Sequence, residues 1–146
     1  MMAEEGTMAV TVAVAIATGC GAVTATYDAL TGTDTSDEPA GIEHCIDLLS
    51  PRLEPGVEAV DEDLDREAAI NHLVEYNVDR QVEFLRESDD VPEDVDVAGV
   101  VYDFQDVYPG RRGEVHVVNV AGETDPAVLR ERYPEFADRI NRRWTY

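Results

Sequence analysis

Two cysteines and three histidines are the side chains of this sequence best suited to bind a metal or to act as a nucleophile. Cys20 lies in the stretch VAVAIATGCGAVTATYDALTG (residues 12–32), where an apolar run ends at Gly19 and a helix rich in small residues is predicted to begin at Gly21. A thiol at the amino end of a helix lies in the positive field of the helix dipole, which lowers its pKa and favours the thiolate. Because thiolates bind soft metals and attack electrophiles, Cys20 is the first candidate site residue. The alternative is that Cys20 is a small core residue.

The other candidate ligands are scattered along the chain. Cys45 and its neighbour His44 fall in one predicted helix, His72 falls in a longer helix, and His116 falls in a late strand. Their spacing in the sequence does not predict that any of them lies close to Cys20 in the fold. A nucleophilic or redox role for Cys20 needs a general base, and no histidine lies close to it in the sequence.

The hydrophobic pattern predicts the elements that must position these residues. Residues 8–17 are apolar and rich in β-branched side chains, as in a strand buried on both faces. Further on, the pattern predicts three helices: one over 21–30, one over 42–49 that ends before Pro51, and a long one over 64–87 capped by Asp61 or Asp63, with a loop over 54–65 before it. Two strands follow, over 96–104 and 114–121, and the second is expected to run antiparallel to the first. A last helix or helix pair covers 125–144 and is interrupted by Pro134. This order predicts one α/β domain over residues 1–146.

Charge is the most unusual property of the composition. The chain has 32 acidic and 11 basic residues, a net charge of −21, and every basic residue is Arg. Such a chain repels nucleic acids and anionic membranes, so we expect neither as a partner. Molar salt shortens the Debye length to roughly 3 Å and screens the self-repulsion. The composition therefore indicates halophilic adaptation and a salt-rich cytoplasm, with a specialised acidic interaction protein as the alternative.

Two features argue against export or membrane insertion. No apolar stretch reaches the roughly 18 residues expected of a membrane-spanning helix. The opening MMAEEG carries two Glu and no basic residue, unlike the start of a secretory signal. With two cysteines, a disulfide framework is not expected either.

Three segments in order resemble the β-carbonic anhydrase family. GCGAVTA, which includes Cys20, is similar to the family's His-x-x-Cys-Gly-Ala-Val zinc-ligand motif after an apolar strand. EYNVDRQVEFLRES (75–88) is similar to the family's long helix, and VAGVVYDF (97–104) is similar to the strand that follows it. The resemblance covers roughly residues 9–121. It implies a mostly parallel sheet flanked by helices, and a zinc enzyme that hydrates carbon dioxide reversibly to bicarbonate.

The resemblance also implies a ligand set that this sequence does not complete. Family zinc is held by two Cys and one His, but Ala17 stands where the His is expected, three residues before Cys20. The family's Cys-x-Asp-x-Arg motif and its strand have no counterpart before residue 8, so the chain resembles an N-terminally truncated member. Cys20 is then the one retained zinc ligand, Gly21 is a candidate substrate-binding residue, and no catalytic residue carries over. Zinc is the cofactor that the family implies, and we expect this chain not to retain it.

Two functions remain open after this comparison. The first is a carbonic anhydrase with absent or very low activity; the second is a non-catalytic remnant of the same fold that binds a partner. Without the family's early strands, the apolar strand at 8–17 becomes an open edge, which predicts a homo-oligomer or pairing with another chain through that edge. The 123–146 tail carries five arginines, for which pairing with acidic groups within the fold and pairing across a dimer are both open, and no site is assigned to them.

Overall fold

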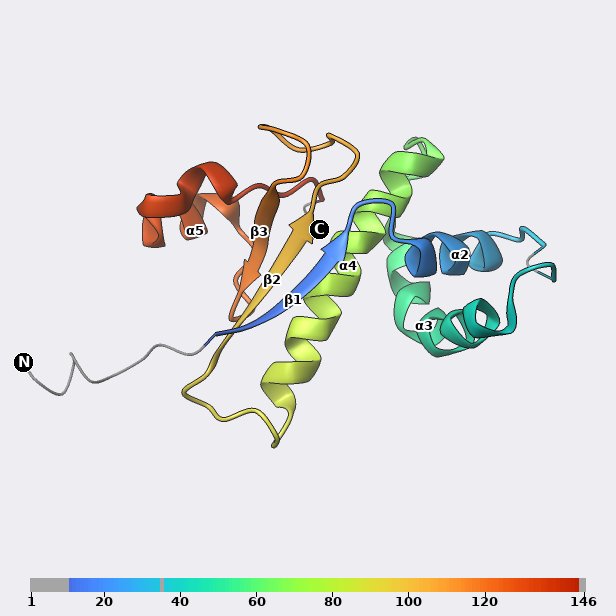
Figure 1. Ribbon diagram of the computed structural model, residues 1–146, viewed down its shortest axis with the longest axis horizontal. Coiled ribbons are helices and arrows are strands. Elements are labelled where there is room, and N and C mark those ends of the chain that lie inside the picture. Colours follow the sequence, from blue (N-terminus) through green and yellow to red (C-terminus); the bar gives the residue numbers. More distant parts are fainter. Residues whose placement is uncertain (1–10, 35, 145–146) are drawn as a thin grey trace, which may run out of the picture.

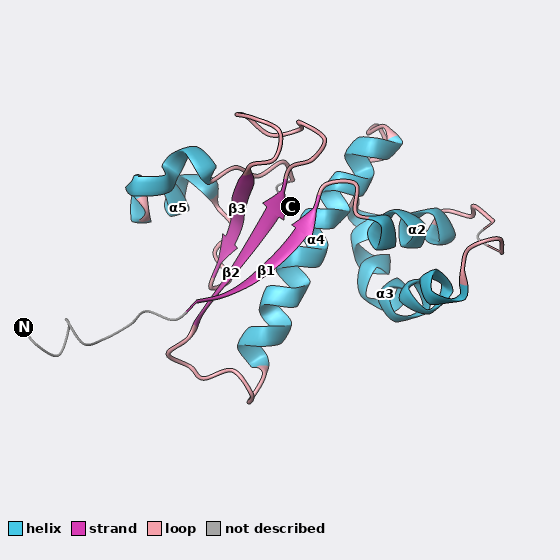
Figure 2. Cartoon of the chain, viewed as in Figure 1, coloured by secondary structure: helices cyan, strands magenta, loops and turns pink. Residues whose placement is uncertain are grey.

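The computed structural model describes residues 11–34 and 36–144. In chain order, the elements are β1 (Thr11–Ala17), α2 (Gly21–Leu30), α3 (Ala40–Ala59), α4 (Arg66–Glu87), β2 (Asp96–Tyr102), β3 (Val115–Val120), α5 (Pro126–Arg132) and the 3₁₀ helix η1 (Pro134–Arg139). One strand, three helices, two strands and a final helical pair follow one another as the sequence predicted, which confirms the α/β class (Figure 2).

The strands form one mixed sheet in the order β1-β2-β3. β1 pairs in parallel with β2, and β3 pairs antiparallel with β2, as the sequence predicted. Helix α4 runs along the sheet, α2 and α3 lie on the far side of α4, and α5 lies beside β3 (Figure 1). Among the described residues, no helix combines the length and the apolar character that crossing a bilayer requires.

The main core lies between α4 and the sheet. Val74, Val78 and Val82 of α4 are wholly buried and belong to the same cluster as Val97 and Val101 of β2. Gly99 lets β2 approach the helix closely, because a Cβ atom there would lie 2.3 Å from a methyl carbon of Val78. This packing fixes the carboxyl ends of β1 and β2 over the first half of α4.

Helix α3 corrects the prediction of a short helix over 42–49. The helix continues to Ala59 through Pro51 and Pro55, so the predicted loop is helical over its first part. A proline inside a helix costs about 3 kcal/mol because it removes a hydrogen bond and crowds the preceding turn. Burial of Leu53 and close packing of Gly56 on the Tyr76 ring oppose this cost.

Two smaller predictions about helix and strand ends were also wrong. Helix α4 is capped by Asp65, whose carboxylate accepts the Ala68 N–H at 2.8 Å, and not by Asp61 or Asp63. Strand β2 ends at Tyr102, because Asp103 turns its carboxylate back onto the following backbone. The C-terminal helix pair interrupted at Pro134 is confirmed as α5 and η1.

Strand β1 corrects the expectation of a strand buried on both faces. Thr11, Ala13 and Ala15 are exposed, and the alternate residues are only half-buried. Within the described part of the chain, β1 hydrogen-bonds to β2 alone, and no helix covers the face that carries Ala13 and Ala15. Residues 8–10 of the predicted strand lie outside the described residues.

Candidate functional site at the junction of β1 and α2

Cys20 occupies the N-cap position of α2, as the sequence predicted, but makes no side-chain capping bond. A tight turn precedes it: the Cys20 N–H donates to the Ala17 carbonyl at 3.2 Å, and Gly19 adopts a φ of +64° that favours glycine. The thiol is free and half-buried, and it packs against the main apolar cluster. The structure thus combines features of both interpretations of Cys20, a residue at a helix start and a core residue.

A polar network centred on the buried Asn71 fixes this turn. The Gly19 N–H donates to Oδ1 of Asn71 at 2.9 Å, and Nδ2 of Asn71 donates to Oε1 of Gln105 at 2.9 Å. Asn71 is 2% exposed, so its amide has exchanged water for these two partners. The network joins three segments that are distant in sequence: the turn after β1, the first half of α4 and the loop after β2.

Thr18 and Asp103 hold the loop after β2 against the same turn. The Thr18 hydroxyl oxygen accepts the backbone N–H groups of Phe104 and Gln105 at 2.9 and 3.2 Å. The wholly buried Asp103 carboxylate shares the Gln105 N–H, at 3.2 Å, and accepts two more N–H groups, those of Val107 and Tyr108, at 3.1 and 3.0 Å. Asp103 ends the segment VAGVVYD, for which the sequence indicates no site role, and the structure shows that its carboxylate shapes the loop.

A polar hollow of about 380 Å³ lies beside the turn. Its lining residues are Gly19, Thr24, Arg66, Glu67, Ile70 and Gln105. Arg66 is already engaged, since its guanidinium binds the Asp28 carboxylate through bonds of 2.7 to 3.1 Å. Cys20 is not part of the lining. Gly21 begins α2 next to the turn, and a Cβ atom there would meet nothing within 4 Å.

Two of the three histidines are engaged in contacts away from Cys20. His72 stacks on Trp144, with ring centroids 5.8 Å apart. His116 is wholly buried, stacks on Tyr108 at 4.7 Å, and has its Nδ1 within 3.0 Å of Nδ2 of Asn141. Burial lowers the pKa of both imidazoles below the usual value. His44 and Cys45 lie on α3. Over residues 11–34 and 36–144, no three His, Cys, Asp or Glu side chains are grouped as a metal ion requires.

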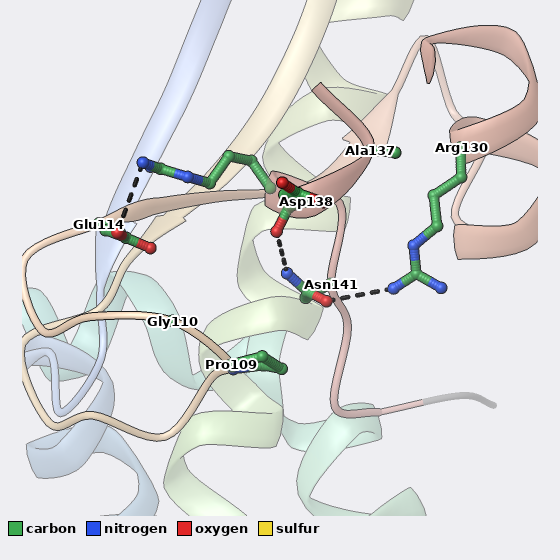
Figure 3. A pocket seen from close by; sticks show the side chains of 8 residues that line it. Pro109, Gly110, Glu114, Arg130, Ala137, Asp138 and Asn141 are labelled. Carbon is green, nitrogen blue, oxygen red and sulfur yellow. Dashed lines mark hydrogen bonds and ion pairs between the residues drawn. The ribbon is translucent and has the colours of Figure 1, made fainter. Parts of the chain in front are cut away.

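A second hollow, of about 630 Å³, opens between the loop after β2 and η1 (Figure 3). It is lined by Pro109, Gly110, Glu114, Arg130, Ala137, Asp138, Arg139 and Asn141. Its two arginines have partners, since Arg130 donates to the Ile140 carbonyl at 2.6 and 3.0 Å and Arg139 pairs with Glu114 at 3.5 Å. Of the two pairings that the sequence left open for the tail arginines, Arg139 shows the one within the fold.

The sequence model of the carbonic anhydrase family matches residues 3–115, which span β1, α2, α3, α4 and β2. The chain belongs to the β-carbonic anhydrase family. Carbon dioxide and bicarbonate are the substrates of that family, and zinc is its cofactor. Comparisons with curated proteins and with solved structures gave no match.

The residues of this chain do not fit the family's zinc site. All of its cysteines and histidines lie among the described residues, and on the resemblance given above only Cys20 is expected to correspond to a family ligand. Ala17, which stands at the position of the family's His, has a methyl group that cannot bind metal. A zinc site held by protein needs three or four ligands.

Proposed function

We propose that this chain is a non-catalytic member of the β-carbonic anhydrase family, with hydration of carbon dioxide absent or very low. The observation that carries the proposal is the pairing of Ala17 and Cys20 in one tight turn, where the family has His and Cys. The substitution lies within the matched region, so it does not depend on what precedes the chain. The engaged histidines support the proposal, because recruiting His72 or His116 would break its stacking contact.

Zinc content and hydration activity test this proposal together. The protein is purified in high salt without chelator or affinity metal, and both quantities are measured for the unmodified chain and for Ala17→His. We expect less than a tenth of a zinc ion per unmodified chain, no hydration above buffer, and tighter zinc binding by the variant, because imidazole adds a second ligand to Cys20. About one zinc per unmodified chain with measurable hydration would refute the proposal.

A role in binding another chain through β1 is the second proposal. β1 lies at an edge of the sheet as described, carries no charged residue over 11–17, and exposes Ala13 and Ala15. An uncharged open edge can pair with a strand of another molecule. We propose self-association through this edge, with a homo-oligomer as the product.

Light scattering after size-exclusion chromatography in high salt tests self-association through β1. The measured molar mass of the unmodified chain should rise with protein concentration. Ala15→Lys should remove that rise, since charge on an edge strand opposes pairing. Thr33→Lys, which adds the same charge in an exposed loop, is the matched control. A monomer at every concentration for the unmodified chain would exclude this role.

The proposed setting is a salt-rich cytoplasm. The charge of −21 supports it, because self-repulsion at low salt opposes the compact state. Unfolding by urea at a series of KCl concentrations tests it. The free energy of unfolding should rise continuously from about 0.1 M to molar salt, where the Debye length falls from roughly 10 to 3 Å. A stability that does not change with salt would contradict the proposal.

A further inference from the structure

The positive charge of this acidic chain is gathered near its C-terminal end, around the hollow of Figure 3. Residues 111–143 carry seven arginines and six acidic residues, a net charge of +1, whereas the rest of the chain carries four arginines and 26 acidic residues, a net charge of −22. The hollow, of about 630 Å³, opens within this segment, and most of its lining residues follow residue 115, where the family match ends. An anion therefore meets far less repulsion near the hollow than near the rest of the chain.

Arg130 lines the hollow with a guanidinium that is held in place but not neutralised. Its Nε and Nη2 donate to the Ile140 carbonyl at 3.0 and 2.6 Å, and Nη2 also donates to Oδ1 of Asn141 at 3.1 Å. These acceptors are neutral oxygens, and within the described part of the chain no carboxylate forms an ion pair with Arg130. Its Nη1 donates to none of the described residues. A guanidinium fixed in this way is preorganised to bind a carboxylate.

Asn141 keeps the Arg130 guanidinium in this position. While its Oδ1 accepts from Arg130, its Nδ2 donates to the Asp138 carbonyl at 3.0 Å and lies within 3.0 Å of Nδ1 of His116, which is wholly buried. The Asn141 amide is therefore tied to groups on both sides. Because these side chains are already ordered, a ligand that binds Arg130 loses little free energy in ordering them.

Arg139 is the second cation of the hollow, and its acidic partner is loosely bound. Nη2 of Arg139 lies 3.5 Å from Oε1 of Glu114, and the two side chains are 46% and 23% exposed. A half-exposed pair of this length contributes little to stability, so the carboxylate of a ligand can take the place of the Glu114 carboxylate on Arg139. Glu114 and Arg130 lie on opposite sides of the view in Figure 3, with Asn141 between them. The two cations are thus available to two separate groups of one ligand.

We propose that this hollow binds an elongated small molecule with a carboxylate at each end, one bound by Arg130 and the other by Arg139. A hollow of about 630 Å³ has the size of a small-molecule site. Asp138, which also lines it, is exposed, so salt screens its repulsion of such a ligand. The hollow shares no lining residue with the one beside Gly19, and the proposal does not depend on the proposed loss of zinc chemistry.

Titration with linear dicarboxylates, from malonate to suberate, tests the proposal on the full chain in about 1 M KCl, where screening removes unspecific attraction. The backbone amide resonances of Gly110, Ala137 and Asn141 report binding by nuclear magnetic resonance. Their shifts should saturate, and one chain length should bind roughly tenfold or more tightly than the monocarboxylate of equal length, because the second carboxylate adds a second contact. Equal binding of dicarboxylates and monocarboxylates would overturn the proposal, and so would no saturation by about 50 mM of any probe.

Four variants assign the binding to the two arginines. Arg130→Gln and Arg139→Gln should each weaken the best dicarboxylate roughly tenfold, because each removes one of its two cations. Arg132→Gln is the matched control, since Arg132 is exposed on α5 and does not line the hollow. Glu114→Gln should tighten binding, because it removes the carboxylate that competes for Arg139, and a damaged fold would not have this effect. If Arg130→Gln loses its helical circular dichroism, Arg139→Gln and Glu114→Gln decide. Equal weakening by Arg132→Gln and Arg139→Gln, or weaker binding by Glu114→Gln, would overturn the proposal.

Discussion

Arg142 and Asp79, 63 residues apart in the sequence, form a buried ion pair in which the side chains are 3% and 2% exposed. Nδ2 of Asn119 also donates to Asp79 at 2.8 Å, so the pair joins the segment after η1 to α4 and β3. Burying two charges is costly unless both are paired and hydrogen-bonded, and here both conditions are met. The pair is therefore sensitive to the loss of either partner.

Arg142→Ala should lower the free energy of unfolding by about 3–5 kcal/mol, because it leaves the Asp79 carboxylate buried without its cation. Chemical unfolding in high salt, followed by circular dichroism, measures the change. Arg139→Ala is the matched control: its pair with Glu114 is half-exposed and spans 3.5 Å, so its removal should cost less than about 1 kcal/mol. Equal losses for the two variants would show that the buried ion pair contributes no more to the free energy of unfolding than the half-exposed pair does.

Glu75 predicts a pH dependence of stability. Burial raises the pKa of its carboxyl, although bonds from Tyr108, Arg143 and Trp144 oppose the shift. Because the folded-state pKa lies above the unfolded value, the folded state binds the proton more tightly. The Glu75 contribution is then most favourable below the unfolded pKa and is lost as pH rises through the folded pKa.

Glu75→Gln isolates this contribution, since it removes the titrating group but keeps the size of the side chain. The free energy of unfolding of the unmodified chain relative to Glu75→Gln should decrease as pH rises from about 4 to about 7. Urea unfolding of both proteins across that range measures the difference. A difference that increases with pH would mean that the hydrogen bonds outweigh burial and lower the pKa instead.

His116 should remain neutral in the fold at pH values where an exposed histidine is already protonated. Burial lowers the pKa of its imidazole, and Nδ2 of Asn141 donates to Nδ1, which selects the tautomer protonated at Nε2. Nitrogen-15 chemical shifts should show that tautomer, with a titration midpoint below about 6.5. The contribution of His116 to the free energy of unfolding is then fully present above the unfolded pKa of about 6.5, and it is lost as pH falls through the lower pKa of the folded state. A midpoint above 6.5 would contradict the assignment.

Gly99→Ala should destabilise the protein by about 1–3 kcal/mol through overpacking, because the new methyl group would lie 2.3 Å from Val78 and 3.0 Å from Val82. Gly21→Ala is the control with the same chemical change: its Cβ would meet nothing within 4 Å, so we expect no loss and a gain of up to about 1 kcal/mol from helix propensity. Thermal unfolding of the two variants in parallel compares them. A loss for Gly21→Ala as large as that for Gly99→Ala would argue against close packing of β2 on α4.

Local patterns predicted the elements around Cys20 well. The small-residue helix from Gly21 to Leu30 and the antiparallel strand that ends at Val120 follow from periodicity and turn residues alone. Helix α3 could not be predicted in the same way, because the rule that proline ends a helix is local, whereas the burial of Leu53 that opposes it is tertiary. The N-cap of α4 is Asp65, two or four residues after the predicted Asp63 or Asp61, because several acidic residues in this segment are equally suited to cap a helix.

The contacts that shape the site were beyond sequence reasoning for the same reason. Gly19 and Asn71 are 52 residues apart, and Glu75 and Trp144 are 69 apart. Nothing local marks Asn71 or Glu75 as buried, since polar residues on a helix are usually exposed. One local signal was available for Asp103: an aspartate directly after a buried strand often turns onto the next backbone amides, and this pattern predicts a fixed loop.

The order of the chain gives the contacts of Glu75 and Asp79 a consequence for biosynthesis. α4, which carries these two carboxylates, leaves the ribosome some 60 residues before Arg142, Arg143 and Trp144, whose groups bind them. Until those residues are made, both carboxylates need water as their partner, because burying an unpaired charge is costly. Completion of the fold is thereby tied to translation of residues 142–144, and a nascent chain that stops before Arg142 is exposed to proteases and chaperones.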